Sequence, residues 1–200
     1  MQKMRSRNLI LHFELNIMRL KEKYQKEVVP RMMEIFKYKN KMAVPKIEKV
    51  VVNVGFGKLV SGKTQEEQKK IANAILEDLA LITGQKPIFT KARKSISTFK
   101  VKKGMILGAK VTLRGKRMYD FLERVIHIAL PRTKDFQGIS EKSFDKKGNL
   151  TIGIPEHIAF PEISPEKVEI SFGLEITIVT NAKKREEAIT LFRLLGFPIK

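Results

Sequence analysis

Cysteine is absent from this chain of 200 residues, and histidine occurs only three times. Without cysteine the protein has no disulfide, no thiolate nucleophile and no cysteine-based zinc site. The three histidines, His12, His127 and His157, lie far apart in the sequence and match no metal-ligand spacing. We therefore expect no metal and no cofactor. The lack of cysteine is typical of a protein of the reducing cytoplasm.

Long hydrophobic runs are also missing. The apolar run from Asn8 to Phe13 is too short for a membrane span and poorly shaped for a signal peptide, so we expect no membrane partner. Met18 is interpreted as the natural start of the chain. Residues 1–17 are then an upstream N-terminal extension, and residues 18–200 are predicted to form a single domain.

Acidic residues are missing from one long stretch. Between Leu79 and Tyr119 there is no Asp or Glu, yet these 41 residues carry eleven Lys or Arg. The whole chain has a formal net charge of +19, whereas residues 120–200 hold twelve basic and twelve acidic residues. A surface of one sign repels itself unless a polyanion neutralises it. The composition therefore favours binding to nucleic acid.

The N-terminal third has clear hydrophobic periodicity. A helix is predicted over Leu20 to Phe36 with a kink at Pro30, and a second helix runs through Ile71 to Ile82 and ends at Gly84. Between them, residues 47–54 alternate as a strand. Glu48, Val50, Val52 and Val54 are predicted on one side, and Ile47, Lys49, Val51 and Asn53 on the other.

The acid-free stretch has the period of a β-hairpin. A strand is predicted over Met105 to Arg114, with Lys110, Thr112 and Arg114 on its polar face. The opposite face, toward a core, holds Leu107, Ala109, Val111 and Leu113. A partner strand is predicted over Ser97 to Val101, with Lys100 on the same polar side, joined by a turn at residues 102–104. The sheet should therefore have an apolar face for helices and a basic face without acids.

The remaining elements complete an α+β fold. We expect a helix from Arg117 to Leu130 stopped by Pro131, with Ile128 in its buried stripe, and a long loop over Arg132 to Asn149. Strands over residues 150–154 and 168–179 and a helix over residues 183–195 follow. The predicted architecture is a largely antiparallel sheet with helices packed on one face and a basic RNA-facing surface.

One motif points to different chemistry. Gly57 to Thr64 matches the phosphate-binding pattern G-x-x-x-x-G-K-T between a predicted strand and a predicted helix. In an NTPase, Lys63 would reach the phosphates and Thr64 the magnesium ion. Such an enzyme also needs an apolar strand ending in Asp on a mostly parallel sheet, and the sequence has no such strand. No nucleophile, base and oxyanion set is recognisable either, so we predict no enzymatic activity.

The type of nucleic acid follows from where the charge lies. No helix-turn-helix, zinc-finger or basic-zipper pattern is present, and the basic residues lie on strands and loops. Strand faces with hydroxyl and amide groups suit RNA, whose 2′-hydroxyls accept such contacts. Asn53 fits either the exposed strand face or a turn before Gly55, and both interpretations stay open at this point.

Several segments together resemble one family. Pro45 to Gly55 (PKIEKVVVNVG), Ile82 to Pro87 (ITGQKP), Thr90 to Ile96 (TKARKSI) and Val111 to Gly115 (VTLRG) closely resemble bacterial large-subunit ribosomal protein five. The C-terminal part adds DFQG at residues 135–138, KSFD at 142–145, FPEI at 160–163 and GFP at 196–198. The resemblance spans residues 20–200 in matching order.

This resemblance implies partners. Members of the family bind 5S rRNA, help to attach it to 23S rRNA in the central protuberance beside neighbouring 5S-binding ribosomal proteins, and approach P-site tRNA. The positions matching Asn53, Gln85 and Thr112 contact 5S rRNA, and the basic-face residues Lys49, Lys100, Lys110 and Arg114 are assigned to the same interface. The family's tRNA-proximal loop corresponds to Lys91, Arg93, Lys94 and Ser95. Asp135, Phe136, Gln137 and Gly138 correspond to the bridge with small-subunit ribosomal protein thirteen.

Two departures from the family pattern are visible. The loop after Gly57 is longer than usual, and this insertion creates the phosphate-loop pattern, which favours coincidence over NTPase activity. Gln137 stands where the family commonly has Arg, which weakens the implied bridge contact. A P-loop NTPase and a free RNA chaperone are kept as alternatives to the ribosomal role.

Overall fold

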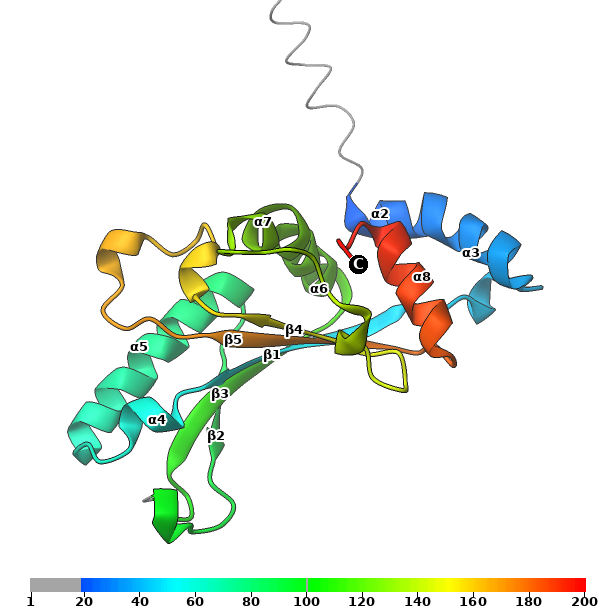
Figure 1. The fold of residues 1–200 in the computed structure, drawn as a ribbon. Helices are drawn as coiled ribbons and strands as arrows, with labels where there is room; N and C mark the ends of the chain where they lie inside the picture. Colours follow the sequence, from blue (N-terminus) through cyan, green and yellow to red (C-terminus); the bar gives the residue numbers. More distant parts are fainter. Residues whose placement is uncertain (1–18, 100) are drawn as a thin grey trace, which may run out of the picture.

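The computed structural model describes residues 19–99 and 101–200. Its centre is a five-stranded sheet in the order β2-β3-β1-β5-β4, and all four pairings are antiparallel (Figure 1). The predicted α+β fold with an antiparallel sheet is confirmed. The strands are β1 (Ile47–Gly55), β2 (Ile88–Lys91), β3 (Ile106–Leu113), β4 (Leu150–Ile154) and β5 (Leu174–Thr180).

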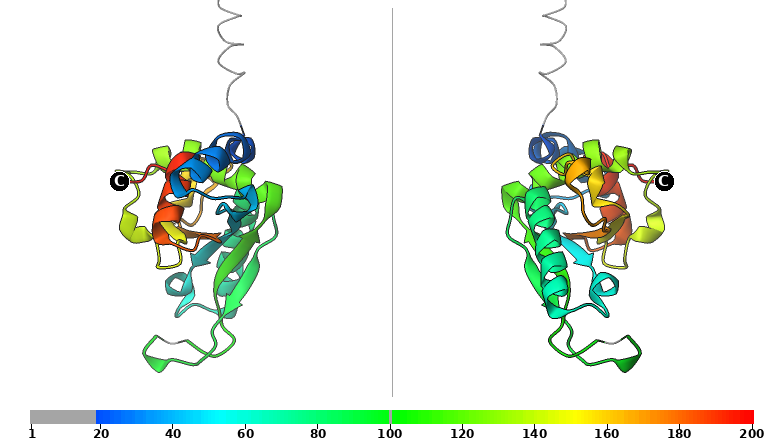
Figure 2. Two further views of the ribbon diagram at one scale, coloured as in Figure 1. Left: turned by 90° about the vertical axis from the view of Figure 1, so that its right-hand side faces the viewer. Right: turned by 90° about the vertical axis from the view of Figure 1, so that its left-hand side faces the viewer.

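The helices gather on one side of this sheet (Figure 2). The predicted helix through Ile71 to Ile82 is confirmed, with its end at Gly84 in the left-handed conformation, φ 64°. The helices are α2 (Leu20–Lys23), α3 (Val29–Phe36), α4 (Gly57–Val60), α5 (Gln65–Thr83), α6 (Gly115–Arg124), α7 (Leu130–Arg132) and α8 (Arg185–Leu195). Short 3-10 turns are η2 (Lys41–Ala43), η3 (Ser97–Phe99), η5 (Glu141–Ser143), η6 (His157–Ala159) and η7 (Pro165–Lys167).

Two prolines lie inside helical segments without ending them. The π-helical turn η1 (Tyr24–Val28) precedes Pro30, and the π-helical turn η4 (Val125–Ala129) precedes Pro131. Proline has no N–H to donate to the carbonyl four residues back. In each case the wider turn closes through a five-residue hydrogen bond, from Val29 N–H to the Tyr24 carbonyl and from Leu130 N–H to the Val125 carbonyl. The prediction that the helix ends at Leu130 before Pro131 was therefore wrong by two residues, because the helix continues to Arg132.

Burial alternates along the strands and separates a core face from an open face. Val50, Val52 and Val54 have no exposed surface, whereas Asn53 is exposed. The prediction of which side each residue faces was wrong at the start of β1. Glu48 was expected on the side of the buried valines, but Ile47 is buried and Glu48 is exposed. A register shift between Ile47 and Lys49 explains this exchange, because a bulge moves the following residues to the other side.

Two predicted strands differ from the structure. Ser97–Phe99 form the short turn η3, Ile96 and Val101 make a single bridge, and β3 pairs with β2 instead. Alternation over five residues favours a strand, but a strand also needs a pairing partner, and β2 occupies that position beside β3. The last strand begins at Leu174, later than the predicted Val168, because Pro165 starts the turn η7 and its carbonyl accepts the Val168 N–H.

Aromatic side chains hold the core together under the helices. Phe121 of α6 stacks on Phe160, with ring centroids 6.0 Å apart. Phe192 of α8 meets Phe144 and Phe197 edge-on, at 5.4 and 5.0 Å. The predicted stripe of α6 and η4 is confirmed except at Ile128, which is only half-buried, while Met118 is buried instead. Within the described part of the chain, no helix combines the length and the apolarity needed to cross a membrane.

A buried histidine ties α5 to the segment before β5. His157 is fully buried and stacks on the Phe172 ring at 3.9 Å. Its Nδ1 accepts the Phe172 N–H at 3.4 Å, so the ring proton is on Nε2, which lies 3.5 Å from Asp78 Oδ2. Burial lowers the pKa of His157 and raises the pKa of Asp78. Both groups are thereby shifted toward their neutral forms.

Acidification from pH 7 to 5 is expected to destabilise the fold through His157. A histidine with a lowered folded-state pKa takes up its proton first in the unfolded chain, so stability falls below the unfolded pKa of about 6.5, by at most about 1.4 kcal/mol per pH unit. Asp78 has the opposite sign, because its raised pKa lets the folded state take up a proton first. Urea unfolding at both pH values should show a smaller pH effect in His157→Gln than in the wild type, and equal effects would contradict the prediction.

Candidate nucleic-acid interface

The strand pairings align the side chains of the uncovered sheet face in rows. We call this surface the open face. In the first row, Asn53 lies opposite Lys110 on one side and opposite Glu175 on the other. In the second row, Val51 lies between Thr112 and Thr177. The open face consists of Lys49, Val51 and Asn53 of β1, Lys110 and Thr112 of β3, Ile88 of β2, Glu175, Thr177 and Val179 of β5, and Thr151 and Gly153 of β4.

The structure puts two of the predicted polar residues, Asn53 and Thr112, on this face and the third, Gln85, next to Thr112. Asn53 lies in the middle of β1 and is exposed, which decides between its two interpretations in favour of the strand face. Gln85 follows the end of α5, and its Nε2 donates to the Thr112 carbonyl at 3.2 Å. This bond places the Gln85 side chain beside Thr112, although the two residues are 27 positions apart.

The basic residues form a border around these groups. Lys110 and Arg114 are exposed, and Lys49 is half-buried. Arg114 precedes the first turn of α6, just beyond the end of β3. Lys100 lies outside the described residues, so its assignment to this face stays a prediction. The expectation for the extension at residues 1–17 also lies outside the described residues.

One acid lies on the open face, contrary to the prediction that the face has none. Glu175 of β5 is exposed and directly opposite Asn53. The acid-free stretch contains only two strands of the sheet, β2 and β3. Glu175 belongs to β5, which comes from the C-terminal part of the chain with no net charge. The charge count along the sequence could not reveal this neighbour, because strand order decides which segments adjoin.

The predicted tRNA-proximal residues lie at the end of β2, which holds Lys91, and on the loop between β2 and β3. Lys91, Arg93 and Lys94 are exposed. Ser95 has an internal role, because its Oγ accepts the Lys103 N–H at 2.9 Å. Two backbone hydrogen bonds join the two ends of the loop just before β3. Ala92 N–H donates to the Met105 carbonyl, and Gly104 N–H donates to the Ala92 carbonyl.

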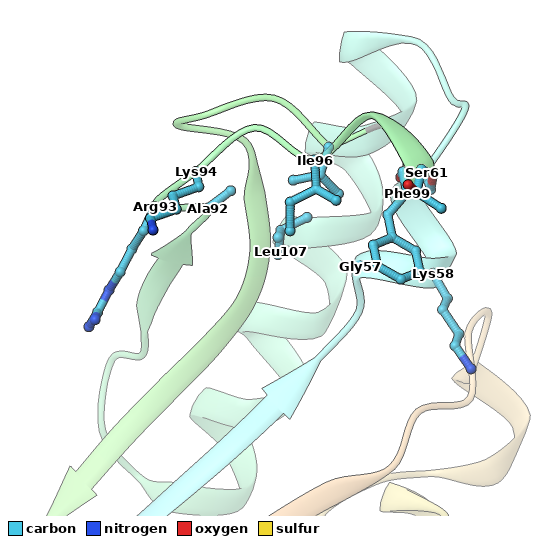
Figure 3. A pocket seen from close by; sticks show the side chains of 11 residues that line it. Gly57, Lys58, Ser61, Ala92, Arg93, Lys94, Ile96, Phe99 and Leu107 are labelled. Carbon is cyan, nitrogen blue, oxygen red and sulfur yellow. Dashed lines mark hydrogen bonds between the residues drawn. The ribbon is translucent and has the colours of Figure 1, made fainter.

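A cavity of about 860 Å³ lies between this loop and α4 (Figure 3). Its walls include Ile96, Phe99 and Leu107, and the loop is held against α4 by the Ser61 hydroxyl, which donates to the Phe99 carbonyl at 3.3 Å. In Figure 3 the charged ends of Arg93 and Lys58 extend away from these apolar side chains. The sequence did not predict this cavity, because residues 97–101 were assigned to a strand.

The predicted bridge residues lie on a third surface, beside the C-terminus. Ile139 N–H donates to the Pro198 carbonyl at 2.7 Å, and Lys200 N–H donates to the Ile139 carbonyl at 3.0 Å. Asp135 has a positive φ of 55°, and Phe136 packs partly against the core. Asp135, Phe136, Gln137 and Gly138 thus form a loop fixed by the C-terminal tail, separate from the open face.

The phosphate-loop pattern does not form a phosphate-binding cradle. Gly57–Val60 is the helix α4, and Thr64 is the N-cap of α5. The Thr64 hydroxyl and N–H are both bonded to Glu67, and the bonds from Thr64 lower the pKa of that carboxyl group. A carboxylate therefore lies at the helix N-terminus where a nucleotide phosphate would bind. In the described ranges 19–99 and 101–200, no group of three or more His, Asp or Glu could hold a metal ion.

Thr64→Ala is expected to cost about 0.5–2 kcal/mol of unfolding free energy, because the N-cap is lost. Lys63→Ala should leave the unfolding free energy nearly unchanged. Neither the wild type nor the two variants should bind ATP or GTP. Urea unfolding and calorimetry with ATP or GTP and magnesium measure both effects. Magnesium-dependent nucleotide binding that disappears in Lys63→Ala would restore the NTPase interpretation.

Comparison with known proteins agrees with the sequence resemblance. A model of ribosomal protein L5 matches residues 40–102, and a model of the C-terminus of the same ribosomal family matches residues 106–199. Large ribosomal subunit protein uL5 of Dictyoglomus turgidum is 55% identical over 181 residues, which cover 90% of this chain and 98% of that protein. The uL5 protein of Halothermothrix orenii is 53% identical over 179 residues, covering 90% of this chain and 97% of that protein. These matches extend over both halves of the sheet, and the chain belongs to the ribosomal protein L5 family.

Proposed function

We propose that this protein holds 5S rRNA on the large ribosomal subunit through the open face. As a member of its family, the chain is a structural component of that subunit and not an enzyme. The observation that carries the finer assignment is that Asn53 and Thr112 lie on the open face, while Gln85 is bonded to the Thr112 carbonyl beside it. Lys49, Lys110 and Arg114 border these groups and supply charge for phosphates.

The chemistry of the open face suits a folded RNA. Amide and hydroxyl groups can both donate and accept, which matches base edges and 2′-hydroxyls. The exposed cations at the border neutralise backbone phosphates, so the complex should weaken with salt. A half-uncovered antiparallel sheet provides a rigid surface on which these groups keep fixed spacings.

The two loops are proposed to contact other parts of the ribosome. The cationic loop with Lys91, Arg93 and Lys94 is proposed to approach P-site tRNA. The loop with Asp135, Phe136, Gln137 and Gly138 is proposed to meet small-subunit ribosomal protein thirteen. Attachment to 23S rRNA and contacts with neighbouring 5S-binding proteins are proposed for the same particle. The three surfaces are separate, which supports simultaneous binding of different partners.

Asn53→Ala is expected to weaken 5S rRNA binding by about 1–3 kcal/mol, because polar groups of the RNA lose their partner in the complex. Asn73→Ala is the matched control, since Asn73 is exposed on α5 away from the open face. Filter-binding titrations of both variants, with tRNA as competitor, measure the effect. Equal affinities for 5S rRNA and the competitor would favour the free RNA chaperone and contradict the proposed function.

A further inference from the structure

The open face is divided into two halves of different chemistry. The half formed by β1 and β3 carries Lys49 and Lys110, with Arg114 at the end of β3. The half formed by β4 and β5 presents neither lysine nor arginine on its described strand residues. Its outward residues are Thr151, Gly153, Glu175, Thr177 and Val179. On the strands of the open face, the positive charges that could bind RNA phosphates therefore lie on the first half.

Glu175 is the central residue of the second half. It lies between Asn53 on β1 and Gly153 on β4 in the first row. Its side chain is exposed, and among the described residues no hydrogen bond or ion pair engages its carboxylate. The carboxylate is therefore available to an external donor.

Open space adjoins this carboxylate. A Cβ atom added to Gly153 would have no neighbour within 4 Å, so the backbone of β4 is uncovered there. In the next row, the hydroxyls of Thr151 and Thr177 are 3.4 Å apart and share a hydrogen bond. A ligand lying over Gly153 would meet the carboxylate on one side and two hydroxyls on the other.

The carboxylate limits what that ligand can be. An ionised carboxylate only accepts hydrogen bonds, and it repels phosphate. Strand spacing places Glu175 and Lys110, two strands apart, at about 10 Å along the row. A phosphate on Lys110 and a donor group on Glu175 can therefore belong to one RNA surface. The shallow minor groove of RNA presents such donors, namely 2′-hydroxyls and the amino group of guanine.

We propose that the RNA interface continues past Asn53 onto β5 and β4, where Glu175 accepts hydrogen bonds from minor-groove 2′-hydroxyl and amino groups of an RNA that lies over Gly153. This inference rests on the proposed function of the open face and adds a specificity determinant to it. Lys110 and its neighbours then supply affinity for any RNA. Glu175 increases the affinity only of an RNA that presents hydrogen-bond donors next to its carboxylate. A surface acid that merely reduced the positive charge would instead weaken all RNAs equally.

The test compares full-length variants in binding to 5S rRNA and to a scrambled RNA of equal length. Glu175→Ala should weaken 5S rRNA binding at least fivefold while binding of the scrambled RNA stays unchanged or becomes tighter. Gly153→Val should also weaken 5S rRNA binding at least fivefold by filling the space over β4. Its unfolding midpoint in urea should not fall, because valine suits a strand and meets no neighbour there. Glu34→Ala on α3 is the charge control and should bind both RNAs as the wild type does.

Three results would overturn the inference. If Glu175→Ala bound both RNAs more tightly by the same factor, Glu175 would act only through unspecific charge repulsion of RNA. If Gly153→Val bound 5S rRNA as tightly as the wild type, the RNA would not lie over β4. Failure of the wild-type protein to distinguish the two RNAs would overturn the proposed function itself, and this inference with it.

Discussion

Lys110→Glu is expected to weaken 5S rRNA binding at least tenfold. Lys110 is exposed on β3, directly opposite Asn53, with Ile88 of β2 on its other side. The substitution exchanges an attractive charge for a repulsive one next to Asn53 on the open face. The loss of one neutralised phosphate should also reduce the slope of log affinity against log salt by about 0.7–0.9.

The matched control is Lys21→Glu on α2. Lys21 is exposed, and α2 packs against α6 on the side of the sheet that the helices cover. The control has the same change of net charge, so it should reproduce any general electrostatic effect. Filter binding of both variants from 50 to 200 mM salt measures affinity and slope together. Equal losses in the two variants would mean that net charge, and not the open face, governs binding.

Phe192→Ala is expected to cost about 3–5 kcal/mol of unfolding free energy. Phe192 of α8 has no exposed surface, and its ring meets Phe144 and Phe197 edge-on. Its removal leaves a cavity where α8, the segment before β4 and the C-terminal tail meet. Because the Phe197 ring of the C-terminal tail loses its contact with the Phe192 ring, the tail that fixes the loop at Ile139 should loosen.

Phe99→Ala provides the control for this prediction. The Phe99 side chain is 66% exposed on the loop between β2 and β3, so its loss should change stability by less than about 0.5 kcal/mol. Urea unfolding of both variants, followed by far-UV circular dichroism, measures the difference. Similar losses in the two variants would show that the aromatic cluster around α8 contributes little to stability.

Local patterns predicted much of the fold because each element was signalled by its own residues. The alternation of valines in β1, the glycines at the ends of α5 and α8 and the strand over residues 150–154 needed no knowledge of neighbours. The bulge at Ile47 was not predictable in this way, because a one-residue register shift is fixed by pairing with β5 and leaves no mark on the alternation.

The candidate site was predicted in part for the same reason. Asn53 and Thr112 lie on strands whose period assigns them to the exposed side, and the structure confirms this. The proximity of Gln85 to Thr112 arises from the turn that follows α5, and Glu175 reaches Asn53 only through the strand order. Both relations are long-range, and neither periodicity nor charge along the chain contains them.

Crosslinking from position 53 is the most direct test of the open face as the 5S rRNA site. A photoreactive amino acid would replace Asn53 in one full-length protein and Asn73 of α5 in another, and each would be irradiated with total ribosomal RNA. We expect position 53 to crosslink to 5S rRNA and position 73 to give no crosslink to it. Crosslinks to 5S rRNA from position 73 with none from position 53 would contradict the assignment of 5S rRNA to the open face.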